Sequence, residues 1–156
     1  MQTTTLTFES RLAANPQQVW EWICSIEGIS REMSPILQMS SPRELQSITA
    51  IPFRAGVPMF RSWIRLGGII PIDYSDLTLV SLTPGVGFVE ESPMGSMRLW
   101  RHARQLSTLD DGGCLITDTL TFTPRVGGRL AVACVKYFFT HRHKRLRAFL
   151  GEAPNR

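Results

Sequence analysis

The sequence predicts an α+β domain in which a curved antiparallel sheet of about six to seven strands wraps around a long C-terminal helix. Two observations support this prediction. Between residues 44 and 123, short apolar or alternating segments are separated by turn residues, as in consecutive strands joined by hairpins. After them, residues 129–150 contain no proline or glycine and repeat apolar side chains at helical spacing. A sheet with one apolar face must be covered, and this helix is the element long enough to cover it.

The N-terminal part is predicted to form a strand, a helix and an irregular link. Residues 4–12 alternate apolar and polar side chains, which is typical of a half-buried strand. Asn15 followed by Pro16 is a favourable helix start, and the apolar spacing beyond them predicts a helix that ends at about Glu27. Residues 28–43 contain two prolines and are expected to form one helical turn or a loop.

The middle of the chain is predicted to form consecutive strands. In chain order, the predicted strands cover residues 45–51, 60–72, 77–82, 87–91, 97–108 and 114–124. A bulge is expected at Gly67 and Gly68 inside the second of them. The last two strands flank the sequence Asp-Asp-Gly-Gly at 110–113, which is a strong hairpin signal. Strands joined in this way are neighbours and run antiparallel.

The C-terminal segment is predicted to be one helix over residues 129–150, which Gly151 ends. At 1.5 Å per residue such a helix is roughly 33 Å long. Its apolar stripe consists of Val132, Val135, Phe139, Leu146 and Phe149. This stripe is expected to face the sheet.

Composition indicates a single domain spanning residues 1–156, because 156 residues and 17.6 kDa fit one hydrophobic core. With 43% hydrophobic and 19% charged residues, the chain is neither disordered nor fibrous. No apolar run approaches the ~20 residues of a membrane span, and the N-terminus lacks the pattern of a signal peptide. Cys24, Cys114 and Cys134 lie in apolar surroundings and are expected to be reduced core residues. We therefore expect a cytoplasmic protein without stable membrane insertion.

The formal net charge is +4, and 15 of the 17 basic residues are arginine. Six basic side chains gather between His141 and Arg147. One interpretation is a nucleic-acid patch, in which Lys and Arg contact phosphates. The favoured interpretation is a solvated helix end, whose cations complement the helix dipole. No nucleic-acid partner is predicted.

The last hairpin predicts which polar side chains lie inside the sheet. A loop over residues 109–113 pairs Arg104 with Asp118, His102 with Leu120, and Trp100 with Phe122, all on the apolar face. A register shifted by one residue would leave the carboxylate without a cation. Since an unpaired buried carboxylate is costly, the first register is predicted.

The predicted pair of Arg104 and Asp118 allows two interpretations. It is either an ion pair that only satisfies itself, or the polar end of an otherwise apolar pocket, as in most small-molecule sites. Trp63 and Arg65 alternate on a neighbouring strand and are predicted to share the cavity with Trp100. A plain core role also fits Trp63.

General acid–base chemistry is the enzymatic alternative. His102 and Asp118 could exchange protons, and Arg104 could stabilise an enolate. Tyr74 and Glu90 are additional candidates for such a site. The opposing interpretation is that the histidine is a hydrogen-bonded interior residue.

No metal or cofactor is predicted. His141 and His143 are two residues apart on a helix, so their side chains point about 200° apart and cannot chelate together. Ser92 and Ser96 lie near His102 in sequence, but without a nucleophile elbow they give little support for a serine triad.

Two stretches of the chain carry a family resemblance. The first contains Phe88-Val89-Glu90-Glu91-Ser92, Gly95, Trp100-Arg101-His102, Asp118, Phe122 and Pro124, and the second contains Tyr137-Phe138-Phe139, His143 and Leu146. In these motifs the chain resembles a bacterial subgroup of the SRPBCC superfamily, the START-like or helix-grip proteins that include polyketide cyclases and birch-pollen-type ligand carriers. The chain departs from that subgroup at Arg104, where a second histidine is common, and at Phe122, where a tyrosine is found.

The resemblance implies a helix-grip fold with a cavity between the sheet and the C-terminal helix. The favoured function is binding of a hydrophobic or amphipathic small molecule of the lipid, polyketide or aromatic type. The alternative is a cyclase or dehydratase that uses His102 and Asp118 as acid and base. The sequence leaves open whether the chain is an enzyme and whether it forms a homodimer. The expected ligand-binding residues are Trp63, Arg65, Trp100, His102, Arg104, Asp118, Leu120, Phe122, Val135 and Phe139.

Overall fold

Seven strands form one antiparallel sheet in the computed structural model, which describes residues 2–155 of the chain. The elements in chain order are β1 (Thr4–Leu12), α1 (Pro16–Cys24), α2 (Ile26–Met33), β2 (Leu37–Met39), the 3₁₀ helix η1 (Ile48–Ala50), β3 (Pro58–Leu66), β4 (Ile70–Thr83), β5 (Gly87–Glu91), β6 (Met97–Thr108), β7 (Cys114–Pro124) and α3 (Gly128–Leu150). The strand order across the sheet is β1-β7-β6-β5-β4-β3-β2.

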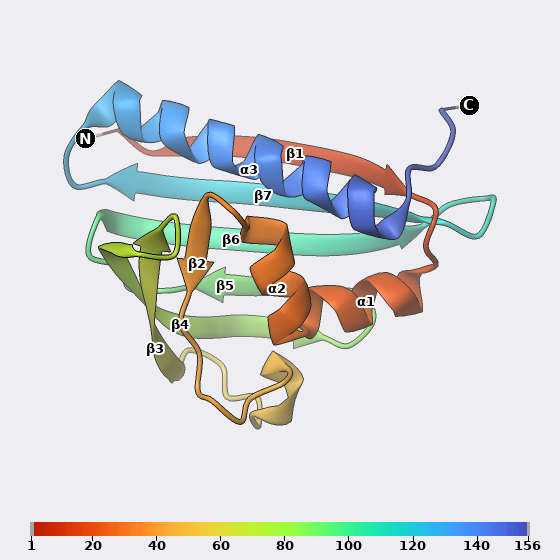
Figure 1. Ribbon diagram of the computed structural model, residues 1–156, viewed down its shortest axis with the longest axis horizontal. Coiled ribbons are helices and arrows are strands. Elements are labelled where there is room, and N and C mark those ends of the chain that lie inside the picture. Colours follow the sequence, from red (N-terminus) through yellow and green to blue (C-terminus); the bar gives the residue numbers. More distant parts are fainter. Residues whose placement is uncertain (1, 156) are drawn as a thin grey trace.

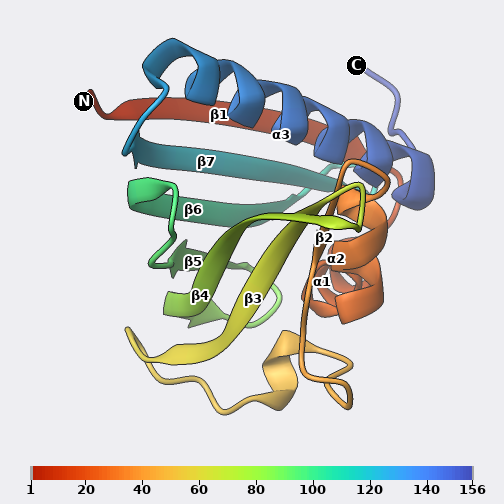
Figure 2. The same cartoon turned by 60° about the vertical axis from the view of Figure 1, so that its left-hand side comes forward.

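The sheet curls around α3. In Figure 1 the long helix lies in front of β1 and β7, and α1 and α2 lie at one end of the sheet. Figure 2 shows β3, β4 and β2 bending forward at the other side of the same sheet, so that the helices and the bent strands face one another. This arrangement confirms the predicted α+β helix-grip architecture.

The β6–β7 hairpin has the predicted register. Arg104 pairs with Asp118, His102 with Leu120 and Trp100 with Phe122. Every second residue of β7 is buried from Cys114 onward, as an inward face requires. Asp118 lies on that face between two apolar clusters of the core, one containing Ile116 and the other containing Leu120 and Phe122.

The predicted helix end at Glu27 is wrong, because the chain turns at Ser25. This residue has extended φ and ψ of −75° and 142°, ends α1 and begins α2. Its Oγ accepts a hydrogen bond of 2.9 Å from the backbone N–H of Gly28 and so caps the second helix. A Cβ at Gly28 would clash with the Trp22 carbonyl oxygen, so glycine permits the close contact of the two helices.

Two strand predictions also fail. Residues 45–51 contain the 3₁₀ helix η1, because Ser47 Oγ accepts a hydrogen bond from the Thr49 N–H and caps this single turn. The predicted strand over 60–72 is two strands joined by a reverse turn. Gly67 and Gly68 have φ of 61° and 77°, and two successive left-handed residues reverse the chain where the sequence suggested a bulge.

The cysteines are free thiols, and two of them are buried as predicted. Burial raises the pKa of Cys24 to about 12 and also raises the pKa of Cys114. The prediction is wrong for Cys134, which is exposed on α3. In the part of the chain that the structure describes, the helices lack the combination of length and apolar character that would let one cross a membrane.

Candidate functional site

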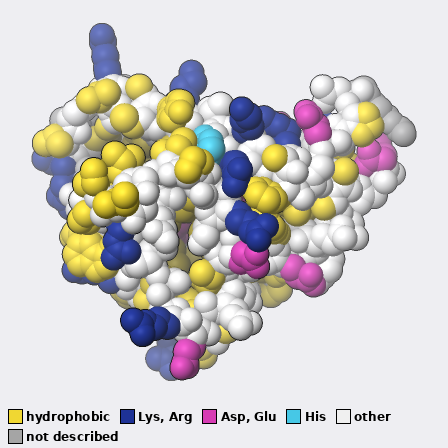
Figure 3. Space-filling view, viewed as in Figure 1, with side chains coloured by type: hydrophobic (Ala, Val, Ile, Leu, Met, Phe, Trp, Pro, Cys, Tyr) yellow, Lys and Arg dark blue, Asp and Glu magenta, His cyan; other side chains and the backbone are white. Residues whose placement is uncertain are grey.

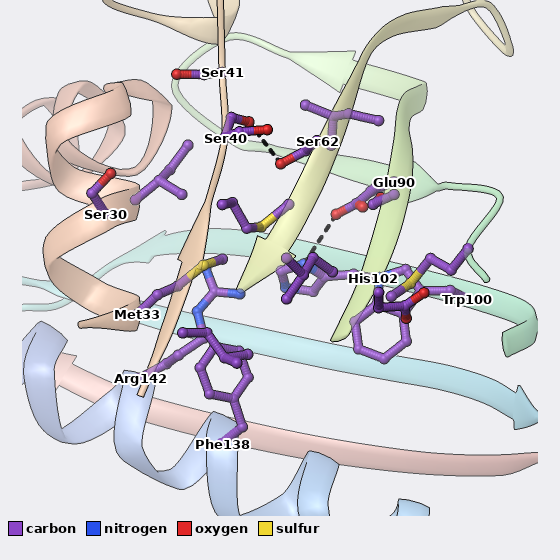
Figure 4. A pocket seen from close by; sticks show the side chains of 18 of the residues that line it. Ser30, Met33, Ser40, Ser41, Ser62, Glu90, Trp100, His102, Phe138 and Arg142 are labelled. Atoms are coloured by element: carbon purple, nitrogen blue, oxygen red, sulfur yellow. Dashed lines mark hydrogen bonds and ion pairs between the residues drawn. The ribbon is translucent and has the colours of Figure 1, made fainter. Parts of the chain in front are cut away.

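The inner face of the sheet, α2 and α3 surround a cavity of about 280 Å³. The space-filling view shows the molecule hollowed left of centre, with apolar side chains gathered on that side (Figure 3). Most of the cavity wall is apolar; it includes Ile23, Ile26, Ile29, Met33, Ile64, Leu77, Leu79, Phe88, Met97 and Phe138. A few polar side chains interrupt this wall, and Figure 4 shows where they lie.

Half of the predicted binding residues line the cavity. They are Trp100, His102, Arg104, Val135 and Phe139. Three others, Asp118, Leu120 and Phe122, are completely buried and are absent from the cavity wall. They lie on β7 and support the residues that form the wall.

Trp63 and Arg65 do not line the cavity, so their predicted placement in its wall is wrong. Their strand β3 turns Ser62 and Ile64 inward instead, and both of these are buried. Trp63 is 45% exposed and packs edge-on against Tyr74, with a ring-centroid distance of 5.9 Å. Because side chains alternate along a strand, the sequence allowed either face to be the inner one.

Asp118 accepts four hydrogen bonds in the interior. Oδ1 accepts from Arg104 Nε and His102 Nε2, each at 2.7 Å. Oδ2 accepts from Arg104 Nη2 at 2.7 Å and from His143 Nε2 at 2.8 Å. Burial alone would raise the pKa of this carboxyl group, but the charges of Arg104 and His102 hold it well below its ordinary value. A carboxylate has about four acceptor positions, so Asp118 has none left for a substrate proton.

Glu32 of α2 is a second buried carboxylate, which the sequence analysis did not identify. It accepts hydrogen bonds from Arg104 Nη1 at 3.1 Å and Nη2 at 2.6 Å, and from Arg142 Nε at 2.9 Å. Burial alone would raise its pKa, but the two guanidinium charges lower it. The residue is completely buried.

Arg104 connects these two carboxylates. Each of its three guanidinium nitrogens donates to Asp118 or Glu32, at distances from 2.6 to 3.1 Å. Burial works against its charge, but the two carboxylates raise its pKa well above the ordinary value. The side chain is 2% exposed and faces the cavity from β6.

His102 faces both the interior and the cavity. Because its Nε2 lies 2.7 Å from the ionised Asp118, we assign a proton to that nitrogen. The other nitrogen, Nδ1, lies 3.6 Å from Glu90 Oε2 in the cavity wall (Figure 4). Burial alone would lower the pKa of the imidazole, but the charge of Asp118 and the hydrogen bonds to Asp118 and Glu90 together raise it. Ser92 Oγ holds the Glu90 carboxylate by donating a hydrogen bond of 2.7 Å.

The basic segment of α3 is not simply a solvated helix end, contrary to the prediction. Arg142 and His143 are buried, with 6% and 3% exposure. His143 Nδ1 lies 2.7 Å from Ser10 Oγ, which also accepts a hydrogen bond of 2.8 Å from Arg147 Nη1. Ser10 thus connects the buried histidine to Arg147 through one hydroxyl group.

A pair of serines lies on the floor of the cavity. Ser62 and Ser75 are opposite each other on β3 and β4, and both line the cavity. Ser62 Oγ donates to the Ser40 carbonyl at 2.7 Å. Among residues 2–155, Ser75 Oγ is buried without a hydrogen-bond partner. A bound molecule with a donor or acceptor group would satisfy this hydroxyl.

No cluster of three or more His, Cys, Asp or Glu side chains within residues 2–155 is arranged to hold a metal ion.

An antiparallel sheet that surrounds a long C-terminal helix and leaves an apolar cavity between them defines a helix-grip protein with the START-like fold. The chain belongs to the family described as Domain of unknown function (DUF8410), whose model matches residues 10–150. Among curated protein sequences, none matches this chain.

Solved structures with the same fold include three that differ strongly in sequence. Protein CV1439 from Chromobacterium violaceum superposes with a TM-score of 0.70 at 12% identity, covering 96% of this chain and 99% of that chain. The Zhui aromatase/cyclase from Streptomyces sp. R1128 gives 0.67 at 12% identity, covering 96% and 94%. A START superfamily protein from Mycobacterium smegmatis gives 0.62 at 9% identity, covering 95% and 96%. At these identities the likeness shows a shared fold.

Proposed function

We propose that this protein binds a hydrophobic or amphipathic small molecule of the lipid, polyketide or aromatic type in the cavity between the sheet and α3. The observation that carries the proposal is the apolar cavity of about 280 Å³ in the interior of a chain of only 156 residues. A bound apolar molecule would remove this apolar wall from water, which is favourable by about 25 cal/mol per Å² of apolar surface buried.

Further support comes from the chemistry of the cavity wall. Small-molecule sites combine a mainly apolar surface with a few placed polar groups. Here the ionisable groups are Asp73, Glu90, His102, Arg104 and Arg142, several serines add hydroxyl groups, and the remaining wall is largely aliphatic and aromatic. The fold shared with an aromatase/cyclase and a START superfamily protein agrees with such a role. The buried free thiols favour the cytoplasm as the place of this function.

Filling the cavity is expected to abolish binding. Ser75→Phe places a ring in the cavity and removes no hydrogen bond, because Ser75 Oγ has no partner among the described residues. We expect the fluorescence titration of a neutral apolar dye to saturate with the wild-type protein and to show no binding with this variant. Ser81→Phe, on the exposed face of the same strand, is the matched control and should bind normally. Equal binding by both variants would place the dye elsewhere.

A second function is favoured by the geometry of His102. With Nε2 held by Asp118, its Nδ1 is the nitrogen available on the cavity side, next to Glu90. We propose that, in an enzyme of the cyclase or dehydratase type, this atom exchanges protons with the substrate. Asp118 then acts as a positioning residue that orients the ring and favours its charged form, since its own oxygens are occupied.

This second function has its own expected result. A β-keto thioester probe in D₂O should exchange the protons between its carbonyl groups faster with the wild-type protein than in buffer. His102→Ala should lose the exchange while still binding the neutral dye, because the apolar wall remains. The NMR signal of the exchanging carbon position is the measurement. Exchange that survives His102→Ala would argue against the imidazole as acid or base.

A further inference from the structure

We propose that the ligand carries a carboxylate and that Arg142 binds it through both terminal nitrogens of its guanidinium group. This inference rests on the proposed binding function and names the chemical class of the ligand: an apolar body with one carboxylate end. The observation behind it is a buried arginine that faces the cavity and uses only one of its three nitrogens within the protein.

Arg142 reaches the cavity from α3. Its Nε donates to Glu32 Oε1 at 2.9 Å, and within residues 2–155 neither Nη1 nor Nη2 has a hydrogen-bond partner. The residue is 6% exposed and lines the cavity. Figure 4 shows the guanidinium group pointing into the space between α3 and the sheet. These N–H groups face the cavity, so an occupant of the cavity is in position to supply their acceptors.

Neighbouring side chains fix the orientation of this guanidinium. Its central carbon lies over the ring of Phe139 at 4.9 Å from the centroid and 5.9 Å from the centroid of Phe138. The bond to Glu32 holds the Nε side. An arginine fixed in this way loses little conformational freedom on binding, and its terminal nitrogens match the two oxygens of a carboxylate.

The other cationic groups of the cavity already face carboxylates of the protein. Arg104 directs all three nitrogens at Asp118 and Glu32. His102 directs Nε2 at Asp118 and faces Glu90 with Nδ1. In Figure 4 the imidazole lies between Glu90 and Arg142, so this carboxylate of the wall is on the far side of it. Among the described cations of the cavity wall, Arg142 is the one with two terminal nitrogens that make no hydrogen bond.

A carboxylate fits this arrangement better than the neutral or cationic alternatives. An alcohol offers one acceptor oxygen to two parallel donors, and an amine would place its own charge against the guanidinium. The two-oxygen anion forms two charge-assisted bonds, which are roughly twice as strong as neutral ones. The apolar remainder of the ligand would lie against the aliphatic and aromatic wall.

The test compares octanoate with 1-octanol, which share an apolar chain and differ at the polar end. Displacement of a bound neutral dye gives both affinities. Because a hydrogen bond to a charged group contributes about 1.5–3 kcal/mol, the wild-type protein is expected to bind octanoate at least about tenfold more tightly than octanol. Arg142→Gln should remove this preference and leave the affinity for octanol unchanged. Glu32 keeps both bonds from Arg104 in this variant, and a thermal melt checks that it folds.

Two further variants sharpen the result. Arg142→Lys keeps the charge but not the paired donors, so it should retain only part of the preference, and it decides the matter if the glutamine variant fails to fold. Lys144→Gln removes an exposed charge from the same helix and should leave the preference intact.

The outcomes separate this inference from the proposed function. Equal affinity for octanoate and octanol in the wild-type protein, or a preference that survives Arg142→Gln, overturns the role of Arg142 and leaves the binding function standing. If the neutral dye binds and octanoate fails to displace it, the carboxylate class is wrong. If neither the dye nor the two octyl compounds bind, the binding function falls and this inference falls with it.

Discussion

Arg104→Leu is expected to destabilise the folded protein by about 3–5 kcal/mol, because it leaves two buried carboxylates without their common partner. Arg104 donates two hydrogen bonds to Asp118 and two to Glu32, and both acceptors are completely buried. Leucine restores neither the charge nor the donors. Urea unfolding followed by circular dichroism at neutral pH measures the loss.

Arg101→Leu is the matched control on the same strand. Arg101 forms an exposed pair with Glu91 at 2.9 Å, in which the two side chains are 44% and 38% exposed. Exposed pairs contribute about 0–1 kcal/mol, so this variant should unfold at nearly the same urea concentration as the wild-type protein. If the two variants lost similar free energies of unfolding, the buried ion pairs of Arg104 would contribute no more to stability than an exposed pair.

The second large effect is expected on acidification. The pKa values of Asp118 and Glu32 are lowered in the folded state by the buried guanidinium groups. A group with a lowered folded pKa contributes stability that is present above its unfolded pKa, about 4, and is lost as the pH falls toward the folded value. Folding stability should therefore decrease steeply below about pH 4.

The contribution of His102 to folding stability changes with pH in the opposite direction. Its pKa is raised in the folded state by Asp118, so its contribution is complete below the unfolded value of about 6.5 and is lost as the pH rises through the folded value. Together the three groups predict a stability maximum between about pH 4.5 and 6.5.

Urea unfolding at a series of pH values measures the free energy of unfolding, and carboxyl ¹³C NMR follows each carboxylate directly. We expect the Asp118 and Glu32 signals to stay in the ionised position until the protein unfolds. Asp76→Asn, which removes an exposed partner of Arg61, should keep the steep acid decrease. A titration of Asp118 near its ordinary pKa in the folded protein would contradict the saturated site described above.

The sequence predicted the part of the site that depends on local pairing. The hairpin loop fixes the β6–β7 register, and that register places Arg104 opposite Asp118. Of the two possible registers, only this one gives the buried carboxylate of Asp118 a cation as its partner, and it was therefore the one predicted. Glu32 had no such local signal, because it lies 72 residues from Arg104 and reaches it through the packing of α2 on α3.

The failures have a common physical origin. Trp63 and Arg65 lie on one face of β3, as the alternation predicts, but alternation does not tell which face of a strand is the inner one. The turn at Gly67 also ends this strand earlier than the sequence indicated. In the same way, the basic segment of α3 has a periodicity that fits either a solvated face or a buried one. Arg142 and His143 are buried because Glu32 and Asp118 come from distant elements to meet them.

The contacts of Glu32 also indicate which part of the cavity wall can move outward when a molecule enters. Moving α2 outward would break its three hydrogen bonds to β6 and α3 and leave charges apart in a dry interior. The neighbouring wall at β2 is built more lightly, because β2 is a three-residue strand at the edge of the sheet, and Leu37 and Met39 at its ends line the cavity. We therefore expect the edge at β2 to yield to an entering molecule more easily than α2 does.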